Sequence, residues 1–116
     1  MSSNKNSVFA ITGESSSNHY LKKSADGGYV KAQYEYGNKL LNGIGINANT
    51  ALGIEYLKKS ADSGYVQAQY EYGTRLLNGK DIDANTDLGI EYVEESANSG
   101  HVLAQYEYGI ILLNGN

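Results

Sequence analysis

Residues 56–79 read YLKKSADSGYVQAQYEYGTRLLNG, and two close relatives of this stretch occupy residues 20–43 and 92–115. Successive copies begin 36 residues apart, and the central copy matches the first at 20 of 24 positions and the third at 16. A fixed period of this size is typical of a repeat array, in which each unit buries its apolar face against its neighbours. Arrays of this kind usually build binding surfaces and seldom catalyse reactions.

Each unit is predicted to form two helices. In the central unit, Asn49 and Thr50 are favoured N-cap residues, and Gly64 suits a left-handed turn between the helices. Small and apolar residues recur at steps of three and four, which indicates a buried helix face. They are Gly53, Leu57, Ser60 and Ala61 in the first helix and Ala68, Gln69, Tyr72, Gly73 and Leu76 in the second. The small members would let helix backbones approach each other closely.

These features predict an all-α fold, a right-handed solenoid of three αα-hairpins. We expect the units at about residues 15–48, 49–84 and 85–116. Residues 1–14 match no part of the repeat and are rich in Ser and Asn, so we expect a disordered tail there.

The composition excludes several classes of site. Without Cys, the 116 residues have no disulfide framework, no thiolate zinc site and no cysteine nucleophile. Near the N-terminus the longest apolar run is residues 8–11, which is too short for a signal-peptide core or a membrane span. We therefore expect a cytoplasmic protein with no cofactor and no membrane attachment.

Charge is distributed unevenly along the chain. Residues 1–80 carry all 9 Lys and Arg against six acids, whereas residues 81–116 carry seven acids and no basic residue. The net charge of −4 and the sequence pI of about 5.0 disfavour nucleic-acid binding. The gradient could steer a partner or orient head-to-tail contacts, and the alternative is sequence drift at solvated positions.

The pattern resembles the Sel-like repeat (SLR), an αα-hairpin solenoid related to the tetratricopeptide repeat. Ser60-Ala61 stands at the family's Ala-Ala pair, Ala68-Gln69 at its Ala-Gln and Tyr72-Gly73 at its Leu-Gly. Gly43-Ile44-Gly45-Ile46 matches its loop. The resemblance covers about residues 16–116 and implies a protein that works as an adaptor or scaffold.

Some positions depart from the family pattern. Gly53 and Gly89 replace an Ala early in the first helix, at a cost in helix propensity of about 0.5–1 kcal/mol each. Asp81 replaces the second loop Gly in one unit. A cysteine-rich branch of the family is linked to penicillin binding, and the absence of Cys argues against that branch.

Residues that suggest chemistry have simpler structural roles. Tyr36, Tyr72 and Tyr108 stand at the family's core Leu place, so we expect them in the core. Tyr34, Tyr70 and Tyr106 should be half-buried, and the alternative is a role as binding hot spots. His101 is isolated, and the Gly-Ile-Gly of the loop has neither a preceding strand nor the Lys of a phosphate-binding loop. We predict no catalytic or metal-binding residue and therefore a non-catalytic protein.

Charged pairs recur at one position of the first helices, opposite the small-residue row. They are Lys22-Lys23, Lys58-Lys59 and Glu94-Glu95. Equivalent positions of a solenoid line up along one surface. We expect a protein partner to bind the groove formed by the first helices at these residues, and ordinary solubilising charge is the alternative.

The last helix is apolar on nearly all sides. Leu103, Ile110 and Ile111 replace polar residues of the earlier copies. A helix that is apolar all round expects to be buried. These residues are therefore a possible end interface, with self-association as the simplest case, and the alternative is that they pack beneath the second repeat.

Overall fold

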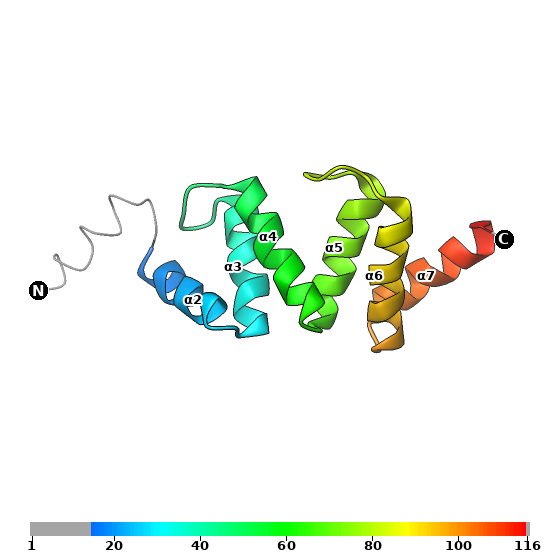
Figure 1. The fold of residues 1–116 in the computed structure, drawn as a ribbon, viewed down its shortest axis with the longest axis horizontal. Helices are drawn as coiled ribbons and strands as arrows, with labels where there is room; N and C mark the ends of the chain where they lie inside the picture. Colours follow the sequence, from blue (N-terminus) through cyan, green and yellow to red (C-terminus); the bar gives the residue numbers. More distant parts are fainter. Residues whose placement is uncertain (1–14, 116) are drawn as a thin grey trace, which may run out of the picture. The chain divides into compact units, whose positions relative to one another are not determined.

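A computed structural model of the chain describes residues 15–115, so the disordered tail expected at residues 1–14 lies outside the described part. Residues 15–115 contain helices joined by turns and no strand (Figure 1). The helices are α2 (Ser16–Asp26), α3 (Val30–Asn42), α4 (Thr50–Asp62), α5 (Val66–Asn78), α6 (Thr86–Asn98) and α7 (Val102–Gly115). Short turns join them in pairs, which confirms the predicted all-α array of helical hairpins.

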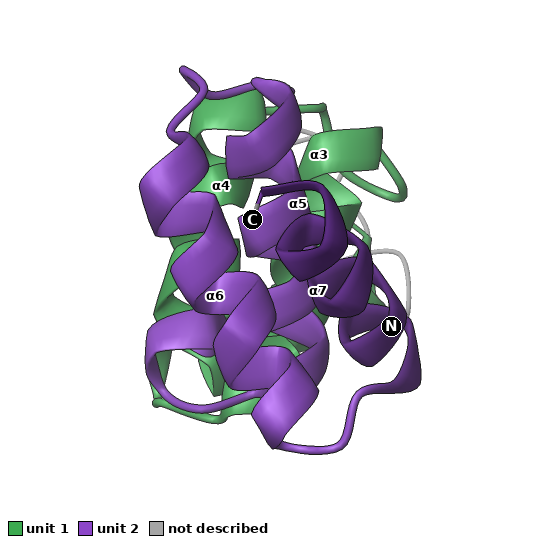
Figure 2. Cartoon of the chain, turned by 90° about the vertical axis from the view of Figure 1, so that its right-hand side faces the viewer, with its two compact units in different colours: residues 1–59 green, residues 60–116 purple. Residues whose placement is uncertain are grey.

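The chain divides into two compact units, residues 1–59 and residues 60–116, and the boundary falls inside α4 (Figure 2). We call them unit 1 and unit 2 and describe each by itself. Unit 1 has a core of small and aromatic residues: Ala25, Ala32, Tyr36, Leu40 and Tyr56. In unit 2, Val93, Ala97 and Ala104 form a buried cluster, and Tyr70, Leu77, Tyr108 and Ile111 pack against it.

Local sequence signals begin and end the helices as predicted. Asn49 Oδ1 accepts a hydrogen bond from Leu52 N at 3.1 Å, and Asn85 Oδ1 accepts one from Leu88 N at the same distance. These side chains satisfy backbone donors that have no partner inside α4 and α6. At the other end of the hairpin, the amide of the Ala-Gln pair ties the helices together, since Gln33 Nε2 donates to Ala25 O at 3.2 Å.

The loop residue Asp81 adopts a backbone conformation that usually belongs to glycine. Its φ is 65°, close to the 73° of Gly45 at the same position of the first loop. A left-handed φ is uncommon for residues other than Gly, although Asp is among those that tolerate it. Arg75 Nη1 lies 2.7 Å from Asp81 Oδ2, and this ion pair holds the substituted loop.

Glycines bring helix backbones together in both units. In unit 1, a Cβ on Gly53 would lie 2.8 Å from Leu41 Cγ and 2.9 Å from the Gly37 carbonyl oxygen. In unit 2, a Cβ on Gly89 would lie 2.9 Å from the Gly73 carbonyl oxygen. The departures from the family's Ala therefore have a physical reason, because α3 and α4, and likewise α5 and α6, approach too closely for any side chain there.

Tyrosines fill the space beside these contacts. Tyr36 meets Tyr56 edge to face with ring centroids 5.0 Å apart, and Tyr72 meets Tyr92 in the same way at 4.9 Å. Tyr36 and Tyr72 are buried as predicted, whereas Tyr108, expected in the core, is only half-buried. Tyr36 and Tyr72 are also covered by the ring of the following helix, and no helix follows α7 among the described residues.

No helix between residues 15 and 115 combines the length and the apolar character needed to cross a bilayer.

We predict opposite effects for two Gly→Ala substitutions in unit 2. Gly89→Ala should destabilise the fold by about 1–3 kcal/mol, because its Cβ overlaps α5. Gly109→Ala should be neutral or stabilise by about 0.5–1 kcal/mol, because nothing lies within 4 Å of its Cβ and Ala favours the helix. Urea unfolding of both variants measures the two signs. Equal effects would show that close packing does not set the requirement for glycine.

Candidate interaction surface

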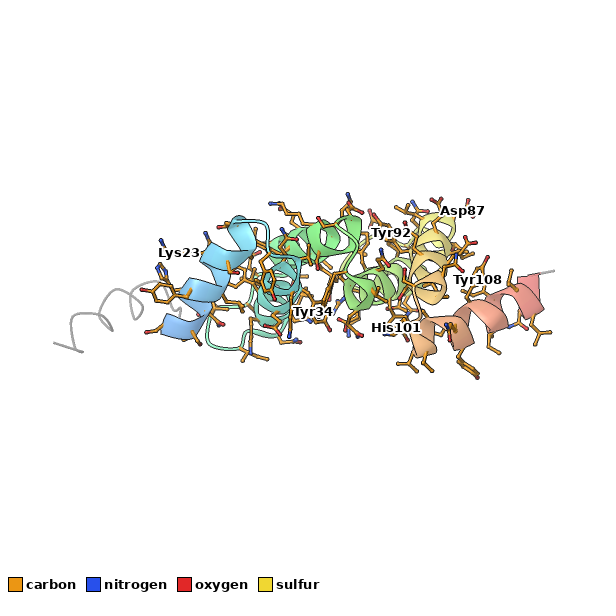
Figure 3. All side chains as sticks on the ribbon, turned by 90° about the horizontal axis from the view of Figure 1, so that it is seen from below. Lys23, Tyr34, Asp87, Tyr92, His101 and Tyr108 are labelled. Atoms are coloured by element: carbon orange, nitrogen blue, oxygen red, sulfur yellow. The ribbon has the colours of Figure 1, made fainter. Side chains whose placement is uncertain are left out.

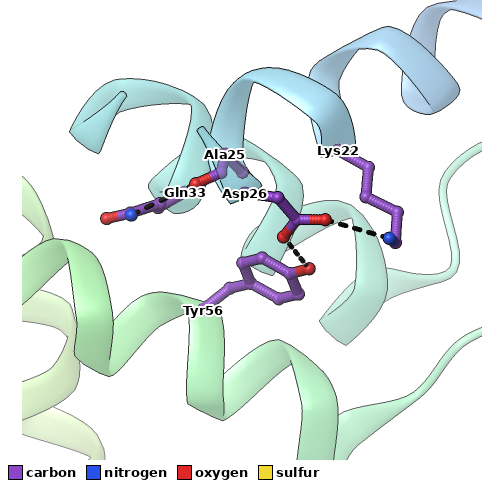
Figure 4. Close-up of polar contacts among 5 residues, drawn as sticks. All are labelled: Lys22, Ala25, Asp26, Gln33 and Tyr56. Atoms are coloured by element: carbon purple, nitrogen blue, oxygen red, sulfur yellow. Dashed lines mark hydrogen bonds and ion pairs between the residues drawn. The ribbon is translucent and has the colours of Figure 1, made fainter. Parts of the chain in front are cut away.

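In unit 1, Asp26 at the end of α2 contacts Lys22 of the same helix and Tyr56 of α4 (Figure 4). Lys22 Nζ lies 3.0 Å from Asp26 Oδ2, and the Tyr56 hydroxyl donates to Asp26 Oδ1 at 2.5 Å. Lys59 Nζ lies 5.4 Å from the centroid of the Tyr56 ring, within the range of a cation–π contact. Lys22 of α2 thus contacts the Asp26 carboxylate directly, and Lys59 of α4 lies over the ring of the tyrosine that donates to it.

The hydrogen bond between Tyr56 and Asp26 shifts both groups. The Tyr56 hydroxyl lowers the pKa of Asp26, and Lys22 lowers it further by a smaller amount, because both groups favour the ionised carboxylate. Burial, reinforced by Asp26, raises the pKa of Tyr56. At neutral pH, the pair is therefore a neutral phenol that donates to a carboxylate.

Unit 2 repeats this pair with the opposite charges beside it. The Tyr92 hydroxyl donates to Asp62 Oδ1 at 2.5 Å, and burial and Asp62 raise the pKa of Tyr92. Glu94 and Glu95 stand where unit 1 has Lys58 and Lys59. A shallow hollow of about 290 Å³ opens there, lined by Asp62, Leu88, Glu91, Tyr92, Glu94 and Glu95. The hollow is acidic, so it suits a basic group of a partner.

The predicted contact residues differ in how freely they face solvent. Lys23, Lys58, Lys59 and Glu95 are exposed, and Figure 3 labels Lys23 on α2. Lys22 and Glu94 are half-buried. Glu94 accepts a hydrogen bond from Tyr108, which raises the pKa of that tyrosine. Sequence reasoning missed Asp26 and Asp62, although the recurrence of an acid or amide at residues 26, 62 and 98 was a usable signal.

The predicted end-interface residues divide between two environments. Leu103 is exposed and Ile110 is 38% exposed. Ile111 is half-buried and packs against the cluster of Val93, Ala97 and Ala104. A shallow depression of about 240 Å³ is lined by Leu77, Tyr106, Glu107, Ile110 and Ile111.

His101 directly precedes α7 (Figure 3), and its ring makes hydrogen bonds within unit 2. Its Nδ1 accepts from Ala104 N at 3.1 Å, so its Nε2 is left to donate to Gln67 Oε1 at 2.8 Å. Its ring stacks on Tyr70 with centroids 4.6 Å apart. The Tyr70 hydroxyl donates to Glu107 at 2.8 Å. Burial, and to a smaller extent this hydrogen bond, raises the pKa of Tyr70 to about 12.

The comparison with family models agrees with this geometry. The Sel1 repeat model matches residues 14–29, 30–65, 66–101 and 102–116. The chain belongs to the Sel1 repeat family. The matched segments have the period of the sequence copies but a different phase, because residues 30–65 pair α3 with α4.

Solved structures of Sel1 repeat proteins share the fold. A Sel1 repeat protein from Oxalobacter formigenes matches with a TM-score of 0.80 and 32% identity, over 84% of this chain and 73% of that one. The c5321 protein, a protective antigen present in uropathogenic Escherichia coli strains and displaying an SLR fold, matches with a TM-score of 0.80 and 26% identity. That match covers 85% of this chain and 21% of the antigen.

No curated protein matches the chain. Sel1 repeat proteins are generally protein-interaction modules, and the family is a non-enzymatic repeat scaffold.

We predict that Tyr56→Phe destabilises the protein by about 1 kcal/mol at neutral pH, because the Asp26 carboxylate loses a donor. The pKa of Asp26 is lowered in the folded state, so this stabilisation is present above its unfolded pKa and is lost as pH falls through the folded value. The gap between wild type and Tyr56→Phe should therefore shrink below about pH 4. Thermal unfolding from neutral to acid pH measures the gap.

The control for this prediction is Tyr29→Phe, since Tyr29 is 61% exposed and should tolerate loss of its hydroxyl. A gap between wild type and Tyr56→Phe that stays constant with pH would contradict a role for the Asp26 carboxylate.

Proposed function

We propose that residues 15–116 form a non-catalytic interaction domain, an adaptor or scaffold, that binds a protein partner through the surface of its first helices. The contacts are Lys22, Lys23, Lys58 and Lys59 in unit 1 and Glu94 and Glu95 in unit 2. The three repeats of this domain span about residues 15–48, 49–84 and 85–116. We also propose a cytoplasmic location, with which the cysteine-free composition is compatible.

The observation that carries this proposal is the contrast between the two faces of each first helix. The inner face has residues of the same type in both copies. Ser60 and Ser96 are fully buried, and so are the aliphatic residues Leu57 and Val93. The outer face keeps the Tyr–Asp pair and reverses the charges beside it. The buried packing is therefore kept in both units while the charges on the outer face are reversed, which supports a role for those charges in selecting a partner.

Opposite charges on the two units favour a partner with a matching pattern. An acidic group would meet the Lys residues near Asp26, and a basic group would enter the hollow beside Glu94 and Glu95. Complementary charges of this kind increase the association rate and the specificity, and salt weakens them.

We predict that Lys58→Glu with Lys59→Glu weakens partner binding by a factor on the order of ten, about 1.4 kcal/mol, at low salt. Stability should fall by less than about 1 kcal/mol, because both side chains are exposed. Capture from a lysate of the source organism followed by mass spectrometry supplies the partner, and titration calorimetry measures its affinity.

The matched control carries Lys31→Glu and Lys80→Glu, the same change in charge at exposed residues outside the first helices. Equal loss of affinity in the two double variants would indicate a general charge effect. Unchanged affinity in the Lys58 and Lys59 variant would refute the proposed surface.

A second candidate function is self-assembly through the last helix. The exposure of large apolar residues on α7 favours it, among them Leu103, Leu112 and Leu113 at 57%, 46% and 75%.

A further inference from the structure

One face of α7 is exposed although the same face is covered in the two earlier copies. Leu40 and Leu76 are each 2% exposed, whereas the equivalent Leu112 is 46% exposed. A Cβ on Gly37 or Gly73 would meet the backbone of the next helix at 3.0 Å, but one on Gly109 would meet nothing within 4 Å. On α3 and α5, this face packs against the following helix, α4 or α6. Among the described residues, the equivalent face of α7 is covered by no following helix.

The complementary face is exposed on α2. Tyr56 and Tyr92 are 7% and 8% exposed, because each packs against the tyrosine of the preceding helix. Tyr20 holds the same position in α2 and is 66% exposed. α2 and α7 therefore carry the two halves of a contact that the chain completes twice internally.

We propose that α2 of a second copy packs against α7 in the way that α4 packs against α3 and α6 packs against α5. In this contact, Tyr20 packs edge to face against Tyr108, and its hydroxyl donates to the side-chain oxygen of Asn98. Asn98 stands where Asp26 and Asp62 accept the equivalent bonds. An amide oxygen accepts this bond as a carboxylate does, so the substitution keeps the acceptor.

A second hydrogen bond supports the same register. Ser96 Oγ donates to the Val66 carbonyl at 2.9 Å, at the start of the helix on which α6 packs. The equivalent pair across the proposed contact is Ser24 of α2 and Val102 of α7. Both residue types are retained, so the contact has the donor and the acceptor it needs.

Charge favours this pairing over a pairing of two α7 helices. Residues 81–116 carry seven acids and no Lys or Arg, and α2 carries Lys22 and Lys23. Although α7 itself has one acid, Glu107, a pairing of two α7 helices would bring two of these acidic segments together, whereas α2 brings Lys22 and Lys23 to one of them. The contact joins different surfaces, so it is heterologous and adds copies head to tail.

One residue limits how tightly the helices fit. Ser17 of α2 stands at the position of Gly53 and Gly89, where a Cβ would lie within 2.9 Å of the facing helix. The proposed contact must therefore open slightly, and association should be weaker than the internal packing. It follows that Ser17→Gly should strengthen association, which a general apolar attraction would not explain.

Sedimentation velocity over a range of protein concentrations tests the proposal with full-length variants. Wild type should gain mass with concentration, and Ser17→Gly should do so at a lower concentration. Tyr20→Ala and Gly109→Leu should each remain monomeric, because each spoils a different end. Both positions are exposed, so circular dichroism should show unchanged folding.

Mixing the two monomeric variants gives the sharpest result. Tyr20→Ala keeps an intact α7 and Gly109→Leu keeps an intact α2, so the mixture should form a one-to-one dimer and grow no further. A mixture that stays monomeric, or a wild type that is monomeric throughout, would overturn the proposal. Self-association of Tyr20→Ala alone would also overturn it, because α7 would then bind α7.

Lys58 and Lys59 lie in α4, outside the proposed contact between α2 and α7, so Lys58→Glu with Lys59→Glu should associate like wild type. A synthetic peptide of residues 50–62 tests another occupant, a first helix that has Gly in place of Ser17. If that peptide binds α7 while wild type stays monomeric, the face accepts a helix of a further repeat and the proposed contact with α2 is wrong.

Discussion

The close approach of helix backbones at paired glycines is the constraint on which the other contacts depend. In unit 1 the pair is Gly37 and Gly53, and in unit 2 it is Gly73 and Gly89. Because the backbones nearly touch, the tyrosine one position before each second-helix glycine reaches the ring of the next first helix. That ring is then placed so that its hydroxyl meets an aspartate 30 residues earlier. Core packing and the polar surface pair thus share one geometric origin.

The fold could be predicted from the sequence because its signals are local and occur three times. The cap Asn49, the turn glycine Gly64 and the small residues facing the neighbouring helix all have the roles expected of them. Gly53 was predicted both to lower helix propensity and, with the other small residues, to let helix backbones approach closely, and the second role is confirmed. This role lies in a contact with another helix, and one copy of a repeat does not show which helix that is.

The candidate surface could be predicted only in outline. The recurring charged pairs are visible in the sequence, and most of them are exposed. The organising role of Asp26 could not be read from its neighbours along the chain, since Tyr56 comes from the following repeat. Tyr108 was expected in the core by analogy with Tyr36 and Tyr72, but burial depends on the next helix as well as on the residue itself.

Three segments of identical sequence, AQYEYG, allow the central claim to be tested without differences in intrinsic chemistry. They are residues 32–37, 68–73 and 104–109. The first two lie in helices that a following helix covers, whereas Gln105, Tyr106 and Gly109 are exposed. If covering of the glycine face stabilises each helix, amide hydrogen exchange should separate the three segments.

Residue-resolved hydrogen exchange by NMR, at a concentration where sedimentation shows a monomer, is the most direct measurement. We predict similar protection in residues 32–37 and 68–73 and exchange about tenfold faster or more in residues 104–109. Equal protection of all three segments in the monomer would show that a covered glycine face is not what stabilises these helices.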